Sequence, residues 1–151
     1  MDYRTIRTRD DGTLASDARI ATAIRLAEVH DAHLTLFTFE VQMLGPSYAH
    51  TATLAGVYDT LFSEAEARLD ARVRVLGARL EATGLPFDVV RAFETLDLIP
   101  HRLARLARLT DLALHSDPDG QLYTGAMLRL LERALFAGET AQLVLPDRAV
   151  E

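Results

Sequence analysis

Short apolar runs alternate with amphipathic stretches along the whole of this chain. Stretches with apolar positions at helical spacing separate runs that are short and continuous enough for buried strands. A repeated strand-helix-strand order implies right-handed crossovers and an open parallel sheet with helices on both faces. No internal repeat or linker interrupts the order, so we expect a single domain over residues 1–151. The expected strands are Arg4–Arg9, His33–Val41, Phe87–Phe93, Leu112–His115 and Gln142–Leu145, and the expected helices are Ser16–Val29, Val57–Leu80, Leu96–Leu109 and Leu122–Phe136.

The second helix has the clearest pattern. Its apolar residues recur every four or three positions until Gly84, which favours a helix end. The segment before it, Gln42–Ala55, is the least regular part of the chain and contains Gly45-Pro46. In the third helix Pro100 is tolerable because it lies near the first turn. Residues expected to face the core are Ile20, Ala23, Ile24 and Ala27 in the first helix, Val57, Leu61, Ala65, Leu69, Val73, Leu76 and Leu80 in the second, and Ile99, Leu103 and Leu106 in the third.

The first strand fits this scheme poorly, because it carries Arg7 and Arg9 where the centre of a doubly covered sheet should be apolar. We expect these arginines either to cap the end of the sheet or to pair with Asp10, Asp11 or Glu94. Such an arrangement would mark a site, or a strand of weak regularity.

Composition is that of an ordinary globular protein. The chain is 49% hydrophobic and 25% charged, has no cysteine, and has no apolar run near the roughly 20 residues that a membrane span needs. The first residues, Met-Asp-Tyr-Arg-Thr, lack the apolar core of a signal peptide. These features predict a cytoplasmic protein without disulfide or thiolate metal chemistry.

The charge balance excludes several classes of function. A net charge of −6 gives no general attraction for nucleic acid or anionic lipid. All 16 basic residues are arginine, which we attribute to the codon bias of a GC-rich genome rather than to phosphate recognition. The absence of lysine excludes a Schiff base, a P-loop lysine and a lysine general base.

With its elements in this order, the chain resembles the universal stress protein family over nearly its whole length. Tyr3–Ile6 followed by Asp11-Gly12-Thr13 is similar to the family's first strand and its Asp-Gly-Ser turn. Ala32–Phe37, Leu112–Ser116 and Gln142–Pro146 resemble its second, fourth and closing strands. The resemblance implies a flavodoxin-like fold with strand order 3-2-1-4-5 and a homodimer formed through the strand Gln142–Pro146.

Some members of that family bind ATP through a motif that follows the fourth strand. The motif consists of Gly-x-x-Gly, a spacer of nine residues and then Gly-Ser or Gly-Thr, and this chain departs from it. Aligned backwards from Pro146, Pro118 and Gln121 stand on the first two glycines and Leu128-Arg129 on the final pair. The loop instead offers Asp117, Pro118 and Asp119, and carboxylates repel phosphate while proline has no N–H to donate. We therefore expect no bound ATP and no other cofactor.

A candidate ligand pocket remains where the strand order reverses, the place where open α/β sheets bind ligands. Asp11, Gly12 and Thr13 would lie there beside His115, Ser116 and Gly120. Asp11 would accept hydrogen bonds from a base or ribose, while Thr13 and Ser116 would donate them. The alternative, which we weigh equally, is a turn with a helix cap, because these residue types are favoured there for local reasons.

Metal and catalytic sites find less support. Asp10, Asp11, His115, Asp117 and Asp119 could hold Mg²⁺ or Ca²⁺, but solvated acidic loops are much commoner. A zinc site could be formed by His30, Asp31 and His33, but a helix end, where histidine is favoured, is the more common reason for this pattern. A solvated helix face is the more common explanation for Arg102, Arg105 and Arg108. The glycine-rich turn that presents a nucleophilic serine in hydrolases is absent around Ser47, Ser63 and Ser116. A catalytic pair of His115 and Ser116 is not expected either, because adjacent strand residues point to opposite faces of the sheet.

Our leading hypothesis is a small, dimeric, non-catalytic regulatory or binding domain of the stress-response type that acts through an unidentified protein partner. The alternative is an adenine-nucleotide-binding stress protein that uses Asp11 and backbone groups around Gly120. A phospho-receiver domain is nearly excluded, because the third strand ends Val90-Arg-Ala-Phe-Glu94 without an aspartate and the chain has no lysine.

Overall fold

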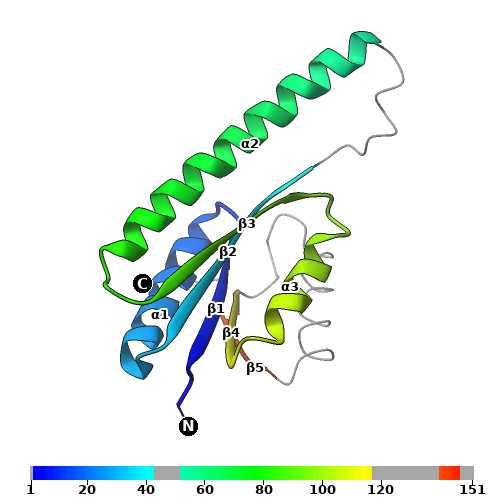
Figure 1. Cartoon of the computed structure of the whole chain (residues 1–151). Coiled ribbons are helices and arrows are strands. Elements are labelled where there is room, and N and C mark those ends of the chain that lie inside the picture. The colour runs from blue at the N-terminus through cyan, green and yellow to red at the C-terminus, as the bar shows by residue number, and fades with distance from the viewer. Residues whose placement is uncertain (1, 43–51, 117–139, 147–151) are drawn as a thin grey trace.

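Five parallel strands form one sheet in the order β3-β2-β1-β4-β5, as a computed structural model shows (Figure 1). The structure describes residues 2–42, 52–116 and 140–146. The order is the one that the family resemblance implied, and it confirms the open flavodoxin-like α/β fold. The strands are β1 (Thr5–Asp10), β2 (His33–Val41), β3 (Phe87–Glu94), β4 (Leu112–Ser116) and β5 (Ala141–Leu145).

The strand β1 lies at the centre of the sheet. It pairs with β2 from Thr5↔His33 to Asp10↔Thr38, and with β4 at Ile6↔Leu112 and Arg7↔Ala113. The order therefore reverses between β1 and β4. After β1 the chain continues to β2 on one side of β1, whereas β4 lies on the other side of β1. A crevice is therefore expected between the carboxyl ends of β1 and β4.

Two helices cover one face of the sheet and a third covers the other (Figure 1). Helices α1 (Leu14–His30) and α2 (Ala52–Glu81) share a core cluster with β1, β2 and β4, while α3 (Ile99–Ala107) packs against a second cluster from β2 and β3. The expected helix Leu122–Phe136 lies outside the described residues. The first cluster includes Ile6, Ile20, Ala23, Leu34, Leu76 and Leu80, and the second contains Phe37, Phe39, Ala92, Ile99 and Leu103.

Helices α1 and α3 have the predicted positions but begin or end at different residues. Helix α1 begins at Leu14 with Thr13 as its N-cap, and α3 is shorter than predicted and carries Pro100 in its first turn. Leu103 is buried and Leu106 partly buried against the core, as expected.

Helix α2 corrects part of the predicted core. It begins at Ala52, within the segment we expected to be irregular, and its first half projects beyond the sheet (Figure 1). The inner half buries the expected stripe, with Leu69 and Leu80 fully buried. Val57 and Leu61 belong to the same predicted stripe but are 54% and 48% exposed. Steps of four residues advance about 40° around a helix, so the stripe has turned away from the buried side by the time it reaches these two residues.

The last strand, β5, lies at one edge of the sheet, beside β4 alone. Its central residue, Val144, is 45% exposed. Within the described parts of the chain, no helix has the length and apolar character needed to cross a membrane.

Candidate functional site

A compact polar cluster lies at the junction of β1 and β4, where the sequence predicts a ligand pocket. The turn Asp11-Gly12-Thr13 follows β1 directly, and Ser116 is the last residue of β4. Gly12 has φ +75°, a conformation that favours glycine. Of the six predicted pocket residues, Gly120 lies outside the described residues.

Asp11 organises the start of α1. Its Oδ1 accepts hydrogen bonds from the Thr13 N–H (3.2 Å), the Thr13 hydroxyl (2.6 Å) and the Ser16 hydroxyl. Thr13 in turn caps the helix, since its Oγ1 accepts from the Ser16 N–H at 3.3 Å. The helix-cap interpretation of this turn is therefore correct, and the oxygen that would accept from a base or ribose already has three protein donors.

A buried arginine joins the two strands at the crevice. The Arg19 side chain, from α1, is 1% exposed, and its guanidinium donates to the Ser116 hydroxyl and, at 2.9 Å and 3.3 Å, to the main-chain oxygen of Arg9. It also donates to the Ser16 hydroxyl (3.0 Å) and lies 3.5 Å from Asp11 Oδ2. The Arg19 guanidinium thus contacts the end of β1, the end of β4 and the cap of α1 at once.

The electrostatics of Asp11 follow from these contacts. Burial alone would raise the pKa of the Asp11 carboxyl, but hydrogen bonds from Ser16 and Thr13 and the charges of Arg19 and Arg9 together lower it. Asp11 is therefore ionised at neutral pH. Its carboxylate is held by two arginines, one of which is Arg9 with Nε 3.7 Å from Oδ2.

On the opposite face of the sheet, Arg9 begins a chain of side-chain hydrogen bonds that reaches the edge strand. Arg9 Nη1 lies 3.4 Å from His115 Nδ1, and His115 Nε2 lies 2.6 Å from Gln142 Oε1. A guanidinium can only donate, so Nδ1 accepts and Nε2 carries the proton that is donated to Gln142. Gln142 Nε2 then donates to the Thr140 oxygen at 3.1 Å, which completes the chain.

His115 is held in its neutral form. Burial, and next the charge of Arg9, lower the pKa of His115 to about 4. Burial and the nearby charge of Arg19 also lower the pKa of Arg9 to about 10, so Arg9 still carries its charge at neutral pH. At neutral pH the imidazole therefore serves as a fixed hydrogen-bonding bridge.

Arg7, two residues before Arg9 on the same face, is also buried. Its Nη1 donates to the Leu103 oxygen of α3 at 2.6 Å, and burial lowers the pKa of Arg7 to about 10. The two arginines thus differ from expectation in part: Arg9 pairs with Asp11, as we considered, whereas Arg7 binds a carbonyl of α3.

A fourth arginine, Arg72 of α2, lies against the turn. Its guanidinium lies 3.6 Å from Asp10 Oδ2 and 3.4 Å from Glu40 Oε2, and it donates to the Phe39 oxygen. A Cβ added to Gly12 would lie 2.6 Å from Arg72 Nη1, so the glycine permits this close approach.

Sequence reasoning brought Asp11, Gly12, Thr13 and Ser116 together correctly, but it missed Arg19 and Arg72. Both stand at apolar-stripe positions, Arg19 four residues before buried Ala23 and Arg72 between buried Leu69 and Leu76. A charged residue on the buried face of a helix is the signal that could have identified them. His115 and Ser116 point to opposite faces as expected, with Ser116 bonded to Arg19 and His115 to Gln142.

The arrangement provides hydrogen bonds and charge, but the described residues show no nucleophile beside a free base. Among the described residues, no group of three histidine or acidic side chains lies close enough to hold a metal ion. The candidates Asp117 and Asp119 fall outside the described residues. His33 binds Asp88 on the neighbouring strand at 3.0 Å, whereas His30 stacks edge-on against Tyr3, so these histidines do not converge.

Comparisons with known proteins place the fold. No protein-family model matches the chain, and no curated protein matches its sequence. Among solved structures, a universal stress protein from Lactobacillus plantarum is 17% identical over 96% of this chain and 99% of its own, with TM-score 0.70. A protein of the universal stress family from Burkholderia pseudomallei is 21% identical over 95% and 96%, with TM-score 0.60. A universal stress protein in complex with cAMP is 15% identical over 98% and 100%, with TM-score 0.62.

These matches confirm that the chain has the fold of universal stress proteins over nearly its whole length, as the sequence resemblance implied.

Proposed function

We propose that this protein is a small, non-catalytic regulatory or binding domain of the universal stress type that works without a bound nucleotide. The observation that carries the proposal is the position of Arg19. Its buried guanidinium joins Arg9, Ser16 and Ser116 at the point where strand order reverses. A protein side chain therefore takes the hydrogen-bonding groups that a ligand at this junction would use.

The chemistry of the described cluster supports a role without catalysis. A general base must be within hydrogen-bond reach of the proton it removes, with a pKa near the working pH. His115 is buried, bonded at both nitrogens and has its pKa lowered to about 4, so it does not meet that requirement at neutral pH. Asp11 is engaged by Thr13, Ser16 and two arginines.

The second candidate function is adenine-nucleotide binding through Asp11, Ser116 and backbone groups near Gly120. It is favoured by the structural likeness to a universal stress protein in complex with cAMP. For this chain it requires Arg19 to leave Ser116, which exposes a buried charge or moves it toward the ligand. We place it second for that reason.

Assembly belongs to the same proposal. We expect a homodimer in the cytoplasm through β5 and Pro146, because β5 is an edge strand with an apolar, 45% exposed Val144 at its centre. The family resemblance points to antiparallel pairing of two such strands across a two-fold axis. Further partners would be proteins rather than nucleic acid or membrane, given the net charge of −6.

Titration calorimetry of the full chain with MgATP, ADP, AMP, cAMP and cyclic dinucleotides tests the proposal. We expect no saturable binding by any of them. A micromolar Kd for MgATP or cAMP would overturn the proposal in favour of the second candidate. In that case Asp11→Asn should weaken binding, while Asp88→Asn, an exposed carboxylate on β3, should not.

A further inference from the structure

The surface of helix α2 can be divided into three sides, two of which contact other parts of the same chain. One side packs on the sheet through Leu69, Leu76 and Leu80. On a second side Asp70 and Glu66 pair with Arg91 of β3 at 2.7 Å and 3.5 Å. The outer half is anchored as well, since Phe62 stacks against Tyr58 and meets the ring of Phe93 edge-on.

The third side of α2 is exposed, and four of its side chains lie in a line parallel to the helix axis. Val57 and Val75 are 54% and 68% exposed, and Glu64 and Arg68 between them are also exposed. Within this row Arg68 pairs with Glu40 at 3.5 Å, and the Arg68 side chain remains 61% exposed. These four residues, which we call the outer row, form part of the exposed surface of α2.

The outer row is symmetric in spacing and complementary in charge. Its members, Val57, Glu64, Arg68 and Val75, are separated by seven, four and seven residues. The two valines are thus 18 residues apart, which is five turns of an α-helix, so they lie on the same face. Reading the row backwards exchanges valine with valine and glutamate with arginine.

We propose that the outer row binds a second copy of this chain, with the two α2 helices antiparallel across a two-fold axis. In that arrangement each Val57 meets Val75 of the second copy, and each Glu64 meets Arg68 of the second copy. An isologous interface uses every contact twice, so one self-complementary row provides two apolar contacts and two ion pairs. A different protein would have no need of the mirrored spacing, and so the occupant is this chain itself.

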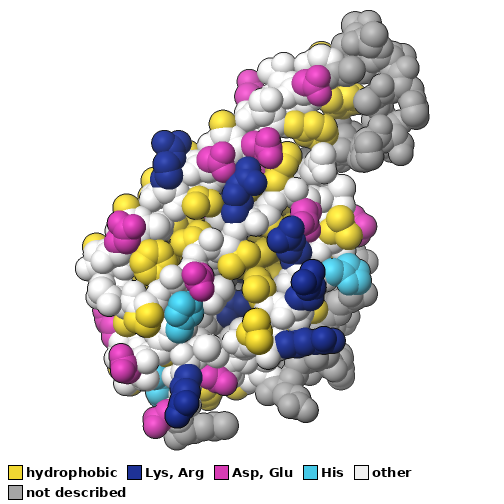
Figure 2. Space-filling model, in the orientation of Figure 1, with side chains coloured by type: hydrophobic (Ala, Val, Ile, Leu, Met, Phe, Trp, Pro, Cys, Tyr) yellow, Lys and Arg dark blue, Asp and Glu magenta, His cyan; other side chains and the backbone are white. Residues whose placement is uncertain are grey.

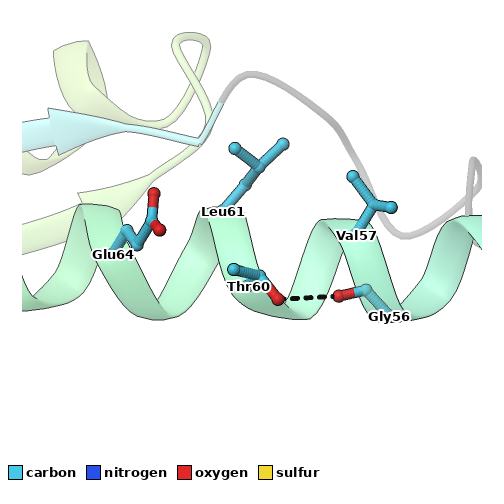
Figure 3. Close-up of a pocket in the computed structure, with 5 residues that line it drawn as sticks. All are labelled: Gly56, Val57, Thr60, Leu61 and Glu64. Carbon is cyan, nitrogen blue, oxygen red and sulfur yellow. Dashed lines mark hydrogen bonds between the residues drawn. The ribbon is translucent and has the colours of Figure 1, made fainter.

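The surface beside the outer row allows a close approach. Shallow depressions run along this half of α2, and small side chains line them at Gly56, Thr60, Ser63 and Ala67. In Figure 3, Val57, Leu61 and Glu64 project from the helix on one side. The Thr60 hydroxyl donates a hydrogen bond to the main-chain oxygen of Gly56 and so does not project into the depressions. Figure 2 shows acidic and basic side chains interspersed along α2 with hydrophobic ones between them.

This contact is separate from the proposed pairing through β5, since it uses a different element. If both two-fold contacts form and their axes cross at right angles, the chain assembles into a tetramer with three perpendicular two-fold axes. Val144→Arg, at the β5 edge, should therefore leave the α2 contact intact.

Charge reversal tests the proposal. In Glu64→Arg the two helices would bring arginine against arginine, and in Arg68→Glu glutamate against glutamate. Each variant alone should self-associate at least about tenfold more weakly than the natural chain, because like charges then face each other twice. When the two variants are mixed, both arginines of the first face both glutamates of the second, and so an equimolar mixture should regain the mass of the natural assembly.

Sedimentation velocity on the full chain, with and without Val144→Arg, measures these masses. Recovery of mass on mixing supports the proposal, because contacts within one chain cannot be restored by a second chain. Two results overturn it: equal masses for the natural chain and both single variants, or a mixture that sediments like the separate variants. Arg25→Glu, a charge reversal at an exposed position of α1, is the matched control and should change nothing.

Discussion

Arg19 and Ser116 are 97 residues apart in the sequence, yet the Arg19 guanidinium donates a hydrogen bond to the Ser116 hydroxyl where β1 and β4 separate. The same guanidinium binds the main-chain oxygen of Arg9, the residue before the last of β1. One side chain therefore ties together the two strands between which the sheet changes direction.

Removing this tie should destabilise the protein. Arg19→Met keeps the apolar stem but deletes the contacts with Arg9, Ser116 and Asp11, and loss of one partner of a buried ion pair costs about 3–5 kcal/mol. Urea unfolding followed by circular dichroism measures the change. Arg25→Met, on the exposed side of the same helix, is the control, and equal effects of the two substitutions would show that the Arg19 contacts contribute nothing.

The inner half of α2 is a stability element. Leu69 is fully buried in the middle of the helix, so Leu69→Ala should lower the free energy of unfolding by about 2–5 kcal/mol. Val29→Ala, at a side chain that is 77% exposed, should change it by less than about 0.5 kcal/mol. A change that small for Leu69→Ala in a denaturant titration would contradict the packing of α2 on the sheet.

The turn after β1 requires glycine for two reasons that can be separated. Gly12 and Gly84 have φ of +75° and +72°, but only Gly12 lies against another side chain, that of Arg72. Gly84→Ala should therefore cost about 1 kcal/mol for its backbone alone, and Gly12→Ala should cost more because Arg72 must also move. Thermal unfolding of both variants gives the comparison, and a smaller loss for Gly12→Ala would refute the contact with Arg72.

His115 should make the protein less stable in mild acid. Its pKa is lowered from 6.5 to about 4 by burial and by Arg9, so folding favours the neutral ring. The contribution is fully present above pH ~6.5 and is lost as the pH falls toward ~4, by up to about 3 kcal/mol. His115→Gln should flatten the dependence of the unfolding free energy on pH over this range, as urea unfolding at several pH values would measure.

The edge strand β5 should carry the homodimer. Val144→Pro removes a main-chain N–H from each copy and should break the β5 contact, leaving only the association through α2, and the chain is also less stable if that N–H serves β4. Val144→Arg keeps the N–H and places a charge at the exposed edge, so it should break the same contact without disturbing the sheet. Sedimentation at micromolar concentration decides between the outcomes, and a β5 contact that persists in both variants would place the interface elsewhere.

The sequence determined the order of the elements and therefore the fold. Apolar periodicity is a local property, readable in Leu34–Phe39 as a strand and in Leu69, Leu76 and Leu80 as one face of a helix, and the structure confirms both. The turn Asp11-Gly12-Thr13 could also be read locally. Its glycine adopts a positive φ and its threonine caps the following helix, so the turn forms from residues that are adjacent in the chain.

The tertiary structure decided the rest, since the missing information concerned distant residues. The apolar stripe of α1 distinguishes Arg19 from Arg25, but only the position of Ser116 makes Arg19 a bridge between two strands. The predicted stripe contains both Val57 and Leu69, which point about 120° apart around α2, and only the placement of the sheet shows that the side of Leu69 is the buried one. Burial depends on what lies opposite a side chain, and local spacing carries no record of that.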